Sequence, residues 1–298
     1  YYVTTLPMVL INGAEGIGTG FSTYIPSHSI EDIKENIKRK LNGQQFKSMK
    51  PYYKGFKGEI TEIKENEYVI KGKYRWDKKT LIVEELPIIG NYRWIEKYKI
   101  FLNKLLDTKK IKDYENYSSE KNIEFHIKFE TKLYNIYKKN INKLEKDLKL
   151  QSSLKITNMY LFDKNYKLKK YNTTLDILED FYNIRLEYYQ KRKNYRLKEY
   201  EKELDKLYEK IKFIECVMNN KIKVFRQKKE NIVKQLEDYE FKKIENSYDH
   251  LLKISLYQFT YEKIEELNNQ KKTKEKEYKI LLNSTKEDLW KNDLINIP

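Results

Sequence analysis

The chain has 298 residues, which is enough for about two modules with a sizeable hydrophobic core. Its 61 Lys and Arg residues outnumber its 45 Asp and Glu residues, and the net charge of +16 favours a polyanionic partner, either nucleic acid or an anionic membrane surface. A single cysteine excludes an intrachain disulfide, and no apolar run approaches the ~20 residues that cross a bilayer.

The first part of the chain predicts a short apolar segment, a loop and a helix. An apolar run over Leu6–Ile11 is followed by a Gly-rich stretch from Asn12 to Ser22, which predicts a tight loop. Ser29 can cap a helix, and Asp32 three residues later resembles a capping box. The apolar positions of that helix repeat at helical spacing, and they are Ile30, Ile33, Ile37 and Leu41.

The middle of the chain, from about Phe56 to Phe162, mixes strand and helix patterns and predicts an α+β domain. Residues 123–129 alternate between apolar and polar side chains, as in a half-buried strand. Shorter strands are predicted at Gly58–Ile63, Tyr68–Lys71, Thr80–Glu84 and Met159–Phe162. Two helices are predicted, one at 94–105 and one at Lys132–Asn142.

After about Leu175 the sequence is helical and highly charged. Apolar residues in alternating three- and four-residue steps predict a coiled-coil helix from Leu175 to about Asn219, roughly 65 Å long at ~1.5 Å per residue. Its expected partner is Tyr261–Leu282, although Lys271 and Lys274 interrupt that apolar seam. The stretch of about 221–259 between them would cap the tip of an antiparallel hairpin.

The short motifs exclude several kinds of site. The glycines of Asn12–Gly20 have neither the dinucleotide-binding spacing nor the Gly-Lys-Ser/Thr of a P-loop, so a structural loop is favoured over a ligand site. His28, His126 and His250 lie far apart in the sequence, without a pattern of Cys or carboxylates around them. The sequence therefore predicts no metal site in this chain.

A series of longer motifs runs through the whole chain in order. They include Pro7–Ser22 with Ile25-Pro26, Pro51–Gly58 with Ile60, Glu84–Pro87, Lys149–Leu154, Asn158–Asp163, Leu168–Tyr171 and Asp288–Lys291. The series resembles, nearly residue by residue in its first member, eukaryotic-type (type IIA) topoisomerase II. The resemblance implies the C-terminal part of the cleavage core, with residues 1–28 as the tail of a winged helix, 29–174 as the DNA-bending tower, and 175–298 as an antiparallel coiled coil with a helical exit gate.

The resemblance also implies a function for the parent enzyme. Such an enzyme is a homodimer that uses ATP and Mg²⁺ to pass one DNA duplex through a double-strand break in another, and so relaxes and decatenates DNA. This chain would bind and bend the cut duplex and form the exit gate. It is expected to lack the catalytic tyrosine, the metal-binding domain and the ATPase domain, to bind no cofactor itself, and to be intracellular and nuclear.

Ten DNA-binding residues are expected on this basis. Ile60 matches an apolar wedge that enters between base pairs and bends DNA, whereas its position alone also fits a strand core residue. Lys54 and Lys57 would meet phosphates, unless they are ordinary surface lysines. Trp94 matches a tryptophan near DNA, although its helical spacing favours core packing. The remaining expected contacts are Lys149, Gln151, Ser152, Ser153, Lys155 and Asn158.

Two departures and two alternatives remain open at this point. The family's aromatic-rich gate motif is largely lost in Tyr248–Thr260, and the segment before it is short, as in a compact viral or AT-rich parasite version. A non-enzymatic nucleic-acid-binding module with a coiled-coil dimeriser is the first alternative. A structural coiled-coil protein whose basic charge reflects only composition is the second.

Overall fold

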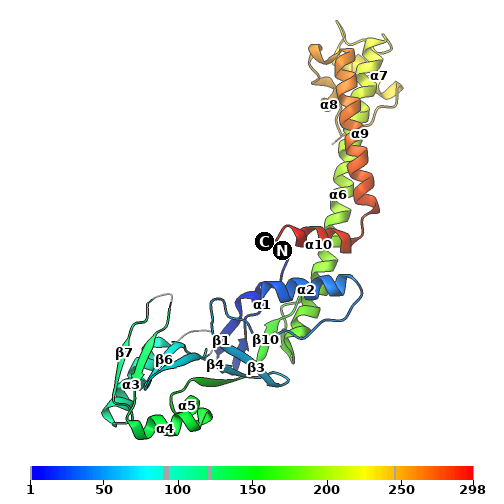
Figure 1. The fold of residues 1–298 in the computed structure, drawn as a ribbon. Coiled ribbons are helices and arrows are strands. Elements are labelled where there is room, and N and C mark those ends of the chain that lie inside the picture. Colours follow the sequence, from blue (N-terminus) through cyan, green and yellow to red (C-terminus); the bar gives the residue numbers. More distant parts are fainter. Residues whose placement is uncertain (1, 90–93, 120–121, 245, 298) are drawn as a thin grey trace. The chain divides into compact units, whose positions relative to one another are not determined.

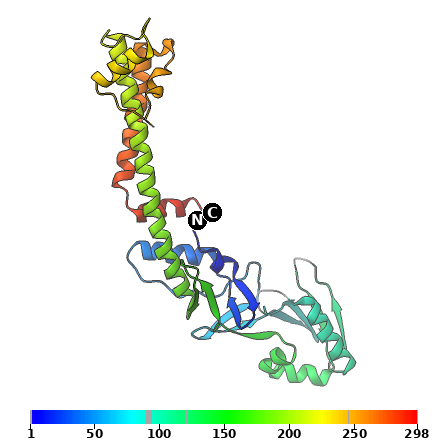
Figure 2. The ribbon, with the colours of Figure 1, turned by 180° about the vertical axis from the view of Figure 1, so that it is seen from behind.

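The computed structural model describes residues 2–89, 94–119, 122–244 and 246–297. The chain divides into two compact units, Tyr1–Arg185 and Leu186–Pro298. The long helix α6 (Thr174–Met218) contributes its first turns to the first unit and the rest to the second. Figures 1 and 2 show the sheets of the first unit and the long helices of the second. This confirms the predicted α+β class.

The N-terminal part of the first unit contains α1 (Met8–Asn12), β1 (Ala14–Gly18), β2 (Phe21–Ile25) and α2 (Ile30–Leu41). The prediction of a loop over Asn12–Ser22 was wrong, because β1 and β2 pair as an antiparallel hairpin. Gly20 turns this hairpin at a φ of 82°, a left-handed conformation that glycine adopts without strain. The residue types did not indicate these strands, because glycine has a low propensity for β-strands and Gly16, Gly18 and Gly20 lie in or beside them.

Ser29 caps the N-terminus of α2, which is the Ser29 half of the capping box that the sequence predicts. The Ser29 hydroxyl oxygen accepts hydrogen bonds from the backbone N–H groups of Glu31 (3.1 Å) and Asp32 (3.3 Å). The hydroxyl itself donates to the Glu31 carboxylate at 2.6 Å. This interaction holds the pKa of Glu31 below its ordinary value, so the carboxylate stays charged at the positive end of the helix dipole.

A three-stranded antiparallel sheet carries five of the ten residues expected to bind DNA. It consists of β3 (Glu59–Lys64), β4 (Glu67–Lys71) and β9 (Gln151–Lys155), in the order β3-β4-β9. The predicted strands at the first two positions are confirmed within one residue. The third was missed because its sequence, Gln-Ser-Ser-Leu-Lys, has only one apolar residue.

A four-stranded antiparallel sheet forms the larger core of the first unit. It consists of β5 (Lys73–Asp77), β6 (Thr80–Glu85), β8 (Phe125–Lys128) and β7 (Asp113–Asn116), in the order β5-β6-β8-β7. The helices α3 (Ile95–Asp107), α4 (Thr131–Lys139) and α5 (Ile141–Asp147) add residues to the same core. Its fully buried side chains include Leu81, Val83, Tyr98, Leu102, Phe125, Ile127 and Leu144.

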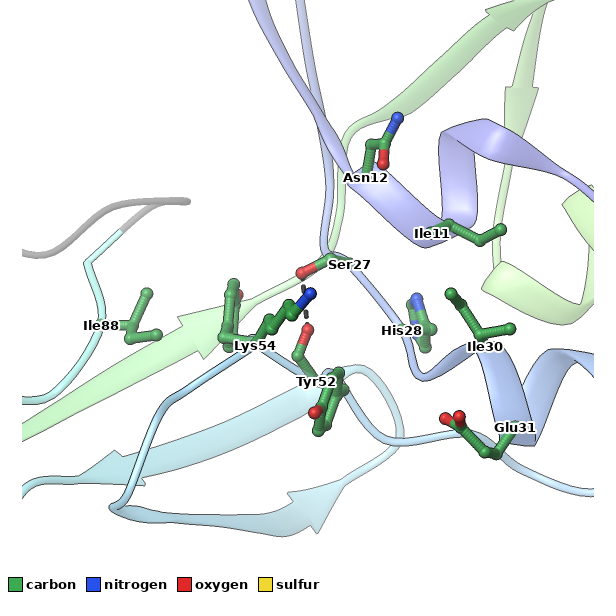
Figure 3. Close-up of a pocket in the computed structure, with 10 residues that line it drawn as sticks. Ile11, Asn12, Ser27, His28, Ile30, Glu31, Tyr52, Lys54 and Ile88 are labelled. Atoms are coloured by element: carbon green, nitrogen blue, oxygen red, sulfur yellow. Dashed lines mark hydrogen bonds between the residues drawn. The ribbon is translucent and has the colours of Figure 1, made fainter. Parts of the chain in front are cut away.

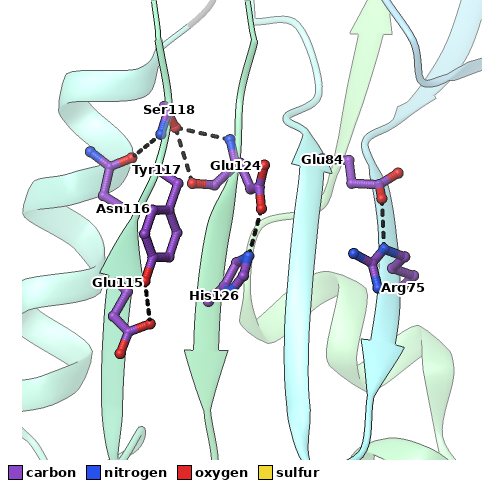
Figure 4. Close-up of polar contacts among 8 residues, drawn as sticks. All are labelled: Arg75, Glu84, Glu115, Asn116, Tyr117, Ser118, Glu124 and His126. Carbon is purple, nitrogen blue, oxygen red and sulfur yellow. Dashed lines mark hydrogen bonds and ion pairs between the residues drawn. The ribbon is translucent and has the colours of Figure 1, made fainter.

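The polar face of this sheet explains why β5 and β7 were missed. Arg75 donates to Glu84 at 2.8 Å, and His126 lies 2.7 Å from Glu124 (Figure 4). Lys128 pairs with Glu115 at 2.7 Å across the β7–β8 pair, and this lowers the pKa of the Glu115 carboxyl. Strands rich in charge do not stand out in a hydrophobic pattern, although cross-strand ion pairs stabilise them.

A small two-stranded sheet completes the first unit. It pairs β10 (Met159–Phe162) with β11 (Leu168–Tyr171) in antiparallel register. It also lies beside the N-terminal hairpin, because the Tyr24 N–H donates to the Asn158 carbonyl at 2.8 Å. The Thr23 hydroxyl both donates to the Tyr160 carbonyl and accepts from the Tyr160 N–H. Segments about 135 residues apart in sequence are thereby joined.

The second unit is organised by α6 and α9 (Tyr261–Asn283), which lie side by side (Figures 1 and 2). The two helices are antiparallel, because Leu267 packs near Ile211 and Ile214 whereas Tyr278, further along α9, bonds to Glu201, earlier on α6. Lys271 and Lys274 do not break this contact. Their ammonium groups lie 5.2 Å from the ring centroids of Tyr208 and Tyr200, and so their stems cover aromatic surface.

The tip of the second unit has its own small core, as the compact stretch of about 221–259 predicts. It contains α7 (Lys229–Asp238), α8 (Asp249–Leu252) and the 3₁₀ turn η1 (Leu256–Gln258). The buried side chains are Phe213, Ile222, Leu236, Phe241, Tyr248 and Leu251. At the other end, α10 (Lys286–Ile295) begins with a capping box between Thr285 and Asp288 and packs Trp290 onto Tyr189. Within the described part of the chain, no helix has the length and apolar character needed to cross a membrane.

Candidate nucleic-acid interface

The register of the three-stranded sheet separates the expected DNA contacts onto two faces. Ile60 stands opposite Ile70, and Ile70 stands opposite Ser152. Directly paired residues point to the same face of a sheet, so these three side chains share one face. The outward face carries the alternate positions of β9, which are Gln151, Ser153 and Lys155. The wedge and this row of donors therefore point to opposite sides of one sheet.

Ile60 is half-buried against a small apolar cluster formed by Tyr53, Ile70 and Ile88. Along its own strand its neighbours on that face are Gly58 and Glu62, which offer it no apolar contact. The apolar neighbours come from the paired strand and from a distant segment. The side chain is thus supported from behind while part of its surface remains exposed, an arrangement compatible with insertion into a stack of bases.

The two lysines before β3 differ in their surroundings. Lys54 is exposed and borders an open cavity of about 600 Å³ (Figure 3), and among the residues that the structure describes it has no ion-pair partner. The Lys57 ammonium donates to the Asn122 side chain at 2.9 Å, and its backbone N–H donates to Glu85. Lys54 is therefore the freer of the two to meet a phosphate.

The same cavity is lined by Ser27, His28, Glu31 and Tyr52, with Ile88 at its far side (Figure 3). The Ser27 hydroxyl donates to the Tyr52 carbonyl at 2.6 Å and joins the two segments. Burial lowers the pKa of His28 to about 4, so its imidazole is neutral near neutral pH. The cavity is thus lined by the Lys54 cation, the Glu31 anion and a neutral histidine.

The segment from Lys149 to Asn158 combines exposed and engaged donors. Lys149 has a φ of 51°, and its ammonium lies 4.5 Å from the centroid of the Phe101 ring. Lys155 is exposed but pairs with Glu67 at 2.9 Å, and this lowers the pKa of Glu67. Asn158 is exposed and donates to the Ser22 hydroxyl at 3.0 Å. A phosphate would have to compete with these partners.

Two of the residues expected to contact DNA, Trp94 and Ser152, instead donate hydrogen bonds to backbone carbonyl groups of this chain. Trp94 is 6% exposed, packs edge-to-face on Tyr98, and donates its indole N–H to the Pro87 carbonyl at 2.7 Å. Its ring therefore has no free face for DNA, which corrects the expectation of a direct contact. Ser152 is half-buried on the Ile60 face and donates its hydroxyl to the Ile88 carbonyl at 2.9 Å. Both residues hold the segment that follows β6.

A basic surface on α4 and α5 was missed by the motif comparison. Four exposed lysines on these helices make no ion pair to any residue that the structure describes, and they are Lys132, Lys139, Lys143 and Lys146. The nearby acids are engaged, since Glu145 is buried beside Lys71 and Asp147 accepts from Tyr137. The signal was present in the sequence as a Lys-rich helix pair with few acids.

No group of three or more His, Cys, Asp or Glu residues able to hold a metal ion occurs among the described residues.

Comparisons with known proteins agree on one family. Residues 1–295 match the family of the DNA gyrase/topoisomerase IV A subunit. The DNA topoisomerase 2 of Plasmodium falciparum is 37% identical over 332 residues, which cover 99% of this chain and 23% of the relative. The DNA topoisomerase 2 of Penicillium chrysogenum is 34% identical over 98% of this chain and 20% of the relative, and the DNA topoisomerase 2-alpha of Cricetulus griseus is 36% identical over 99% and 22%.

A solved structure matches the fold as well. The crystal structure of the Plasmodium falciparum topoisomerase II DNA-binding, cleavage and re-ligation domain superimposes with a TM-score of 0.83 at 38% identity, covering 99% of this chain and 43% of that one. The chain spans about a fifth of the length of the curated relatives. It belongs to the DNA gyrase/topoisomerase IV family, and within that family it is of the eukaryotic topoisomerase II type.

Proposed function

We propose that this chain binds and bends the DNA duplex that a type IIA topoisomerase cuts, and that it forms the exit gate of that enzyme. The observation that carries the proposal is the chain-long similarity to a domain named for DNA binding, cleavage and re-ligation. The alternatives of a non-enzymatic binding module and of a purely structural coiled coil are not favoured by this similarity. The parent enzyme would be an ATP- and Mg²⁺-dependent isomerase that relaxes and decatenates DNA.

In this proposal one residue bends the duplex and the others contact its phosphates. Ile60 is the bending wedge, and Lys54 and Lys57 lie just before it, where they supply phosphate contacts. On the other face of the sheet, Lys149, Gln151, Ser153, Lys155 and Asn158 offer further donors. ATP hydrolysis and strand cleavage are assigned to other parts of the parent enzyme. No residue of this chain is proposed to hold either cofactor.

The proposed domains are a winged-helix tail at 1–28, a tower at 29–174 and a coiled-coil gate at 175–298. The boundary between the two compact units lies at 185/186, inside α6, which fits a tower that leads into a long helix. A DNA substrate places the protein inside the cell, and a nuclear location is part of the proposal. A viral origin receives no support from the relatives described above.

The proposed homodimer would close at the tip of the second unit. Four large apolar side chains there are between 64% and 78% exposed, and they are Phe225, Leu256, Tyr257 and Tyr261. Two of them, Phe225 and Leu256, also line an apolar hollow of about 220 Å³, together with Phe213, Val224 and Leu251 among others. Exposed apolar surface of this kind is typical of an interaction site, and a second copy of this chain is the occupant we propose.

The DNA-binding proposal is tested by measuring duplex affinity at several salt concentrations. We expect log K to fall linearly with log salt, with a slope of roughly −0.9 per phosphate contacted, and Lys54→Ala to reduce the slope by about one. Lys253→Ala, at the end of α8 in the second unit, is the matched control and should leave the slope unchanged. No duplex binding even at low salt would contradict the proposal and favour a structural coiled coil.

The gate proposal is tested by sedimentation of the wild type and two charged variants. Leu256→Asp places a carboxylate at the centre of the proposed contact, and dimer affinity is expected to fall at least about tenfold because the charge would be desolvated. Ile280→Asp changes a residue of similar exposure on the shaft of α9, 69% against 65%, and should not alter dimerisation. Equal dimerisation of all three proteins would place any dimer contact elsewhere.

A further inference from the structure

The three-stranded sheet and the four-stranded sheet of the first unit meet at a crowded backbone junction behind Ile60. The strand β4 ends at Lys71 and β5 begins at Lys73, so the chain passes from one sheet to the other through Gly72 alone. A Cβ atom at Gly72 would collide with the carbonyl oxygen of Glu85, and one at Gly58 would collide with the carbonyl oxygen of Lys71. The Gly72 N–H donates to the Leu150 carbonyl at 2.8 Å. The junction therefore determines the position of the three-stranded sheet, which carries Ile60, relative to the four-stranded sheet.

Glu85 places a buried carboxylate at this junction. The residue is 1% exposed, and one carboxylate oxygen accepts the backbone N–H of Lys57 at 3.2 Å while the other accepts the N–H of Leu86 at 3.2 Å. A carboxyl group is costly to bury unless it is hydrogen-bonded, so its presence here indicates a specific task. The adjacent Glu84 points to the other side of β6, where it pairs with Arg75 and Lys73.

The segment that follows Glu85 is held at two further points. The Pro87 carbonyl accepts the indole N–H of Trp94 at 2.7 Å, and the Ile88 carbonyl accepts the Ser152 hydroxyl at 2.9 Å. The Ile88 side chain packs in the cluster that supports Ile60. Residues 85–88 thus contact the wedge region twice, through the Lys57 backbone before β3 and through the apolar cluster behind it.

We propose that Glu85 is a positioning residue for DNA bending, and this inference rests on the proposed function of Ile60. By holding the Lys57 amide three residues before the wedge, its carboxylate keeps the start of β3 in place when stacked bases push back against Ile60. An inserted side chain bends DNA only if the protein structure that supports it deforms less readily than the stacked bases. Glu85 holds the backbone amide of Lys57 and not its ammonium group, so the phosphate contacts of the lysines, and with them duplex affinity, should depend little on Glu85.

The test compares Glu85→Ala, Glu85→Gln and Glu84→Ala with the wild type by fluorescence transfer across an end-labelled duplex. Glu85→Ala should lower the ratio of bent to straight complexes about tenfold, the loss expected for one hydrogen bond to a charged acceptor, with duplex affinity nearly unchanged. Glu85→Gln keeps one acceptor oxygen for the Lys57 N–H and should recover most of the bending. Glu84→Ala, on the opposite face of β6, should bend DNA as the wild type does.

The outcomes separate the inference from the function on which it rests. A wild type that binds duplex without bending it would contradict the proposed function itself. Normal bending by a folded Glu85→Ala variant, or equal losses of bending and of affinity, would overturn the inference. Should Glu85→Ala not fold, hydrogen exchange in the wild type decides: a protected Lys57 amide supports the inference, and an amide that exchanges at the rate of an open chain contradicts it.

Discussion

A duplex held by the Ile60→Ala variant is expected to stay nearly straight, whereas the same duplex is bent by the wild type. Unstacking a base step costs a few kcal/mol, and an apolar wedge offsets that cost by filling the opened step. Alanine is too small to fill it. The lysines near the wedge and on β9 are unchanged, so the duplex should still bind, with the salt dependence of the wild type.

The measurement is fluorescence transfer between the ends of a labelled duplex at two salt concentrations. Ile63→Ala is the matched control, because Ile63 is on the same strand and is 60% exposed, outside the apolar cluster. Ile60→Ala should cost only about 1–2 kcal/mol of stability, since the side chain is half-buried, and circular dichroism can verify that it folds. Unchanged bending by the folded variant would make Ile60 an ordinary member of the cluster.

The second large effect is expected at the base of the helical unit. Trp290 is fully buried and stacks on Tyr189 with ring centroids 5.6 Å apart. Asp293, one turn further along α10, accepts hydrogen bonds from the Tyr189 hydroxyl and from Arg192, each at 2.7 Å. Trp290→Ala leaves a large cavity beneath α10 and should lower the free energy of unfolding of this unit by about 3–5 kcal/mol.

Urea denaturation followed by circular dichroism at 222 nm measures this loss without relying on the tryptophan that is removed. Ile295→Ala, in the same helix but 73% exposed, should change stability by less than about 0.5 kcal/mol. If the two variants unfolded at the same urea concentration, α10 would not be anchored through Trp290. The first unit should keep its own transition in both variants, because Trp290 lies in the second unit.

The local elements followed from the sequence wherever periodicity was long or a cap was specific. The long helix was predicted at 175–219 and is found at Thr174–Met218, and its partner was predicted at 261–282 and is found at Tyr261–Asn283. Ser29 capped its helix as expected. Short polar strands were missed, because Gln151–Lys155 and Asp113–Asn116 owe their conformation to neighbouring strands rather than to their own apolar residues.

The sequence by itself determined the family, the long helices, the more apolar strands and the residue types available for DNA, because those are carried by local patterns and motifs. Tertiary structure decided which side chains are available. It placed Ile60 and Gln151 on opposite faces of one sheet, engaged Trp94 with the Pro87 carbonyl, and brought Glu85 to the Lys57 amide. These relations depend on strand register and on contacts between distant segments, which no local pattern encodes.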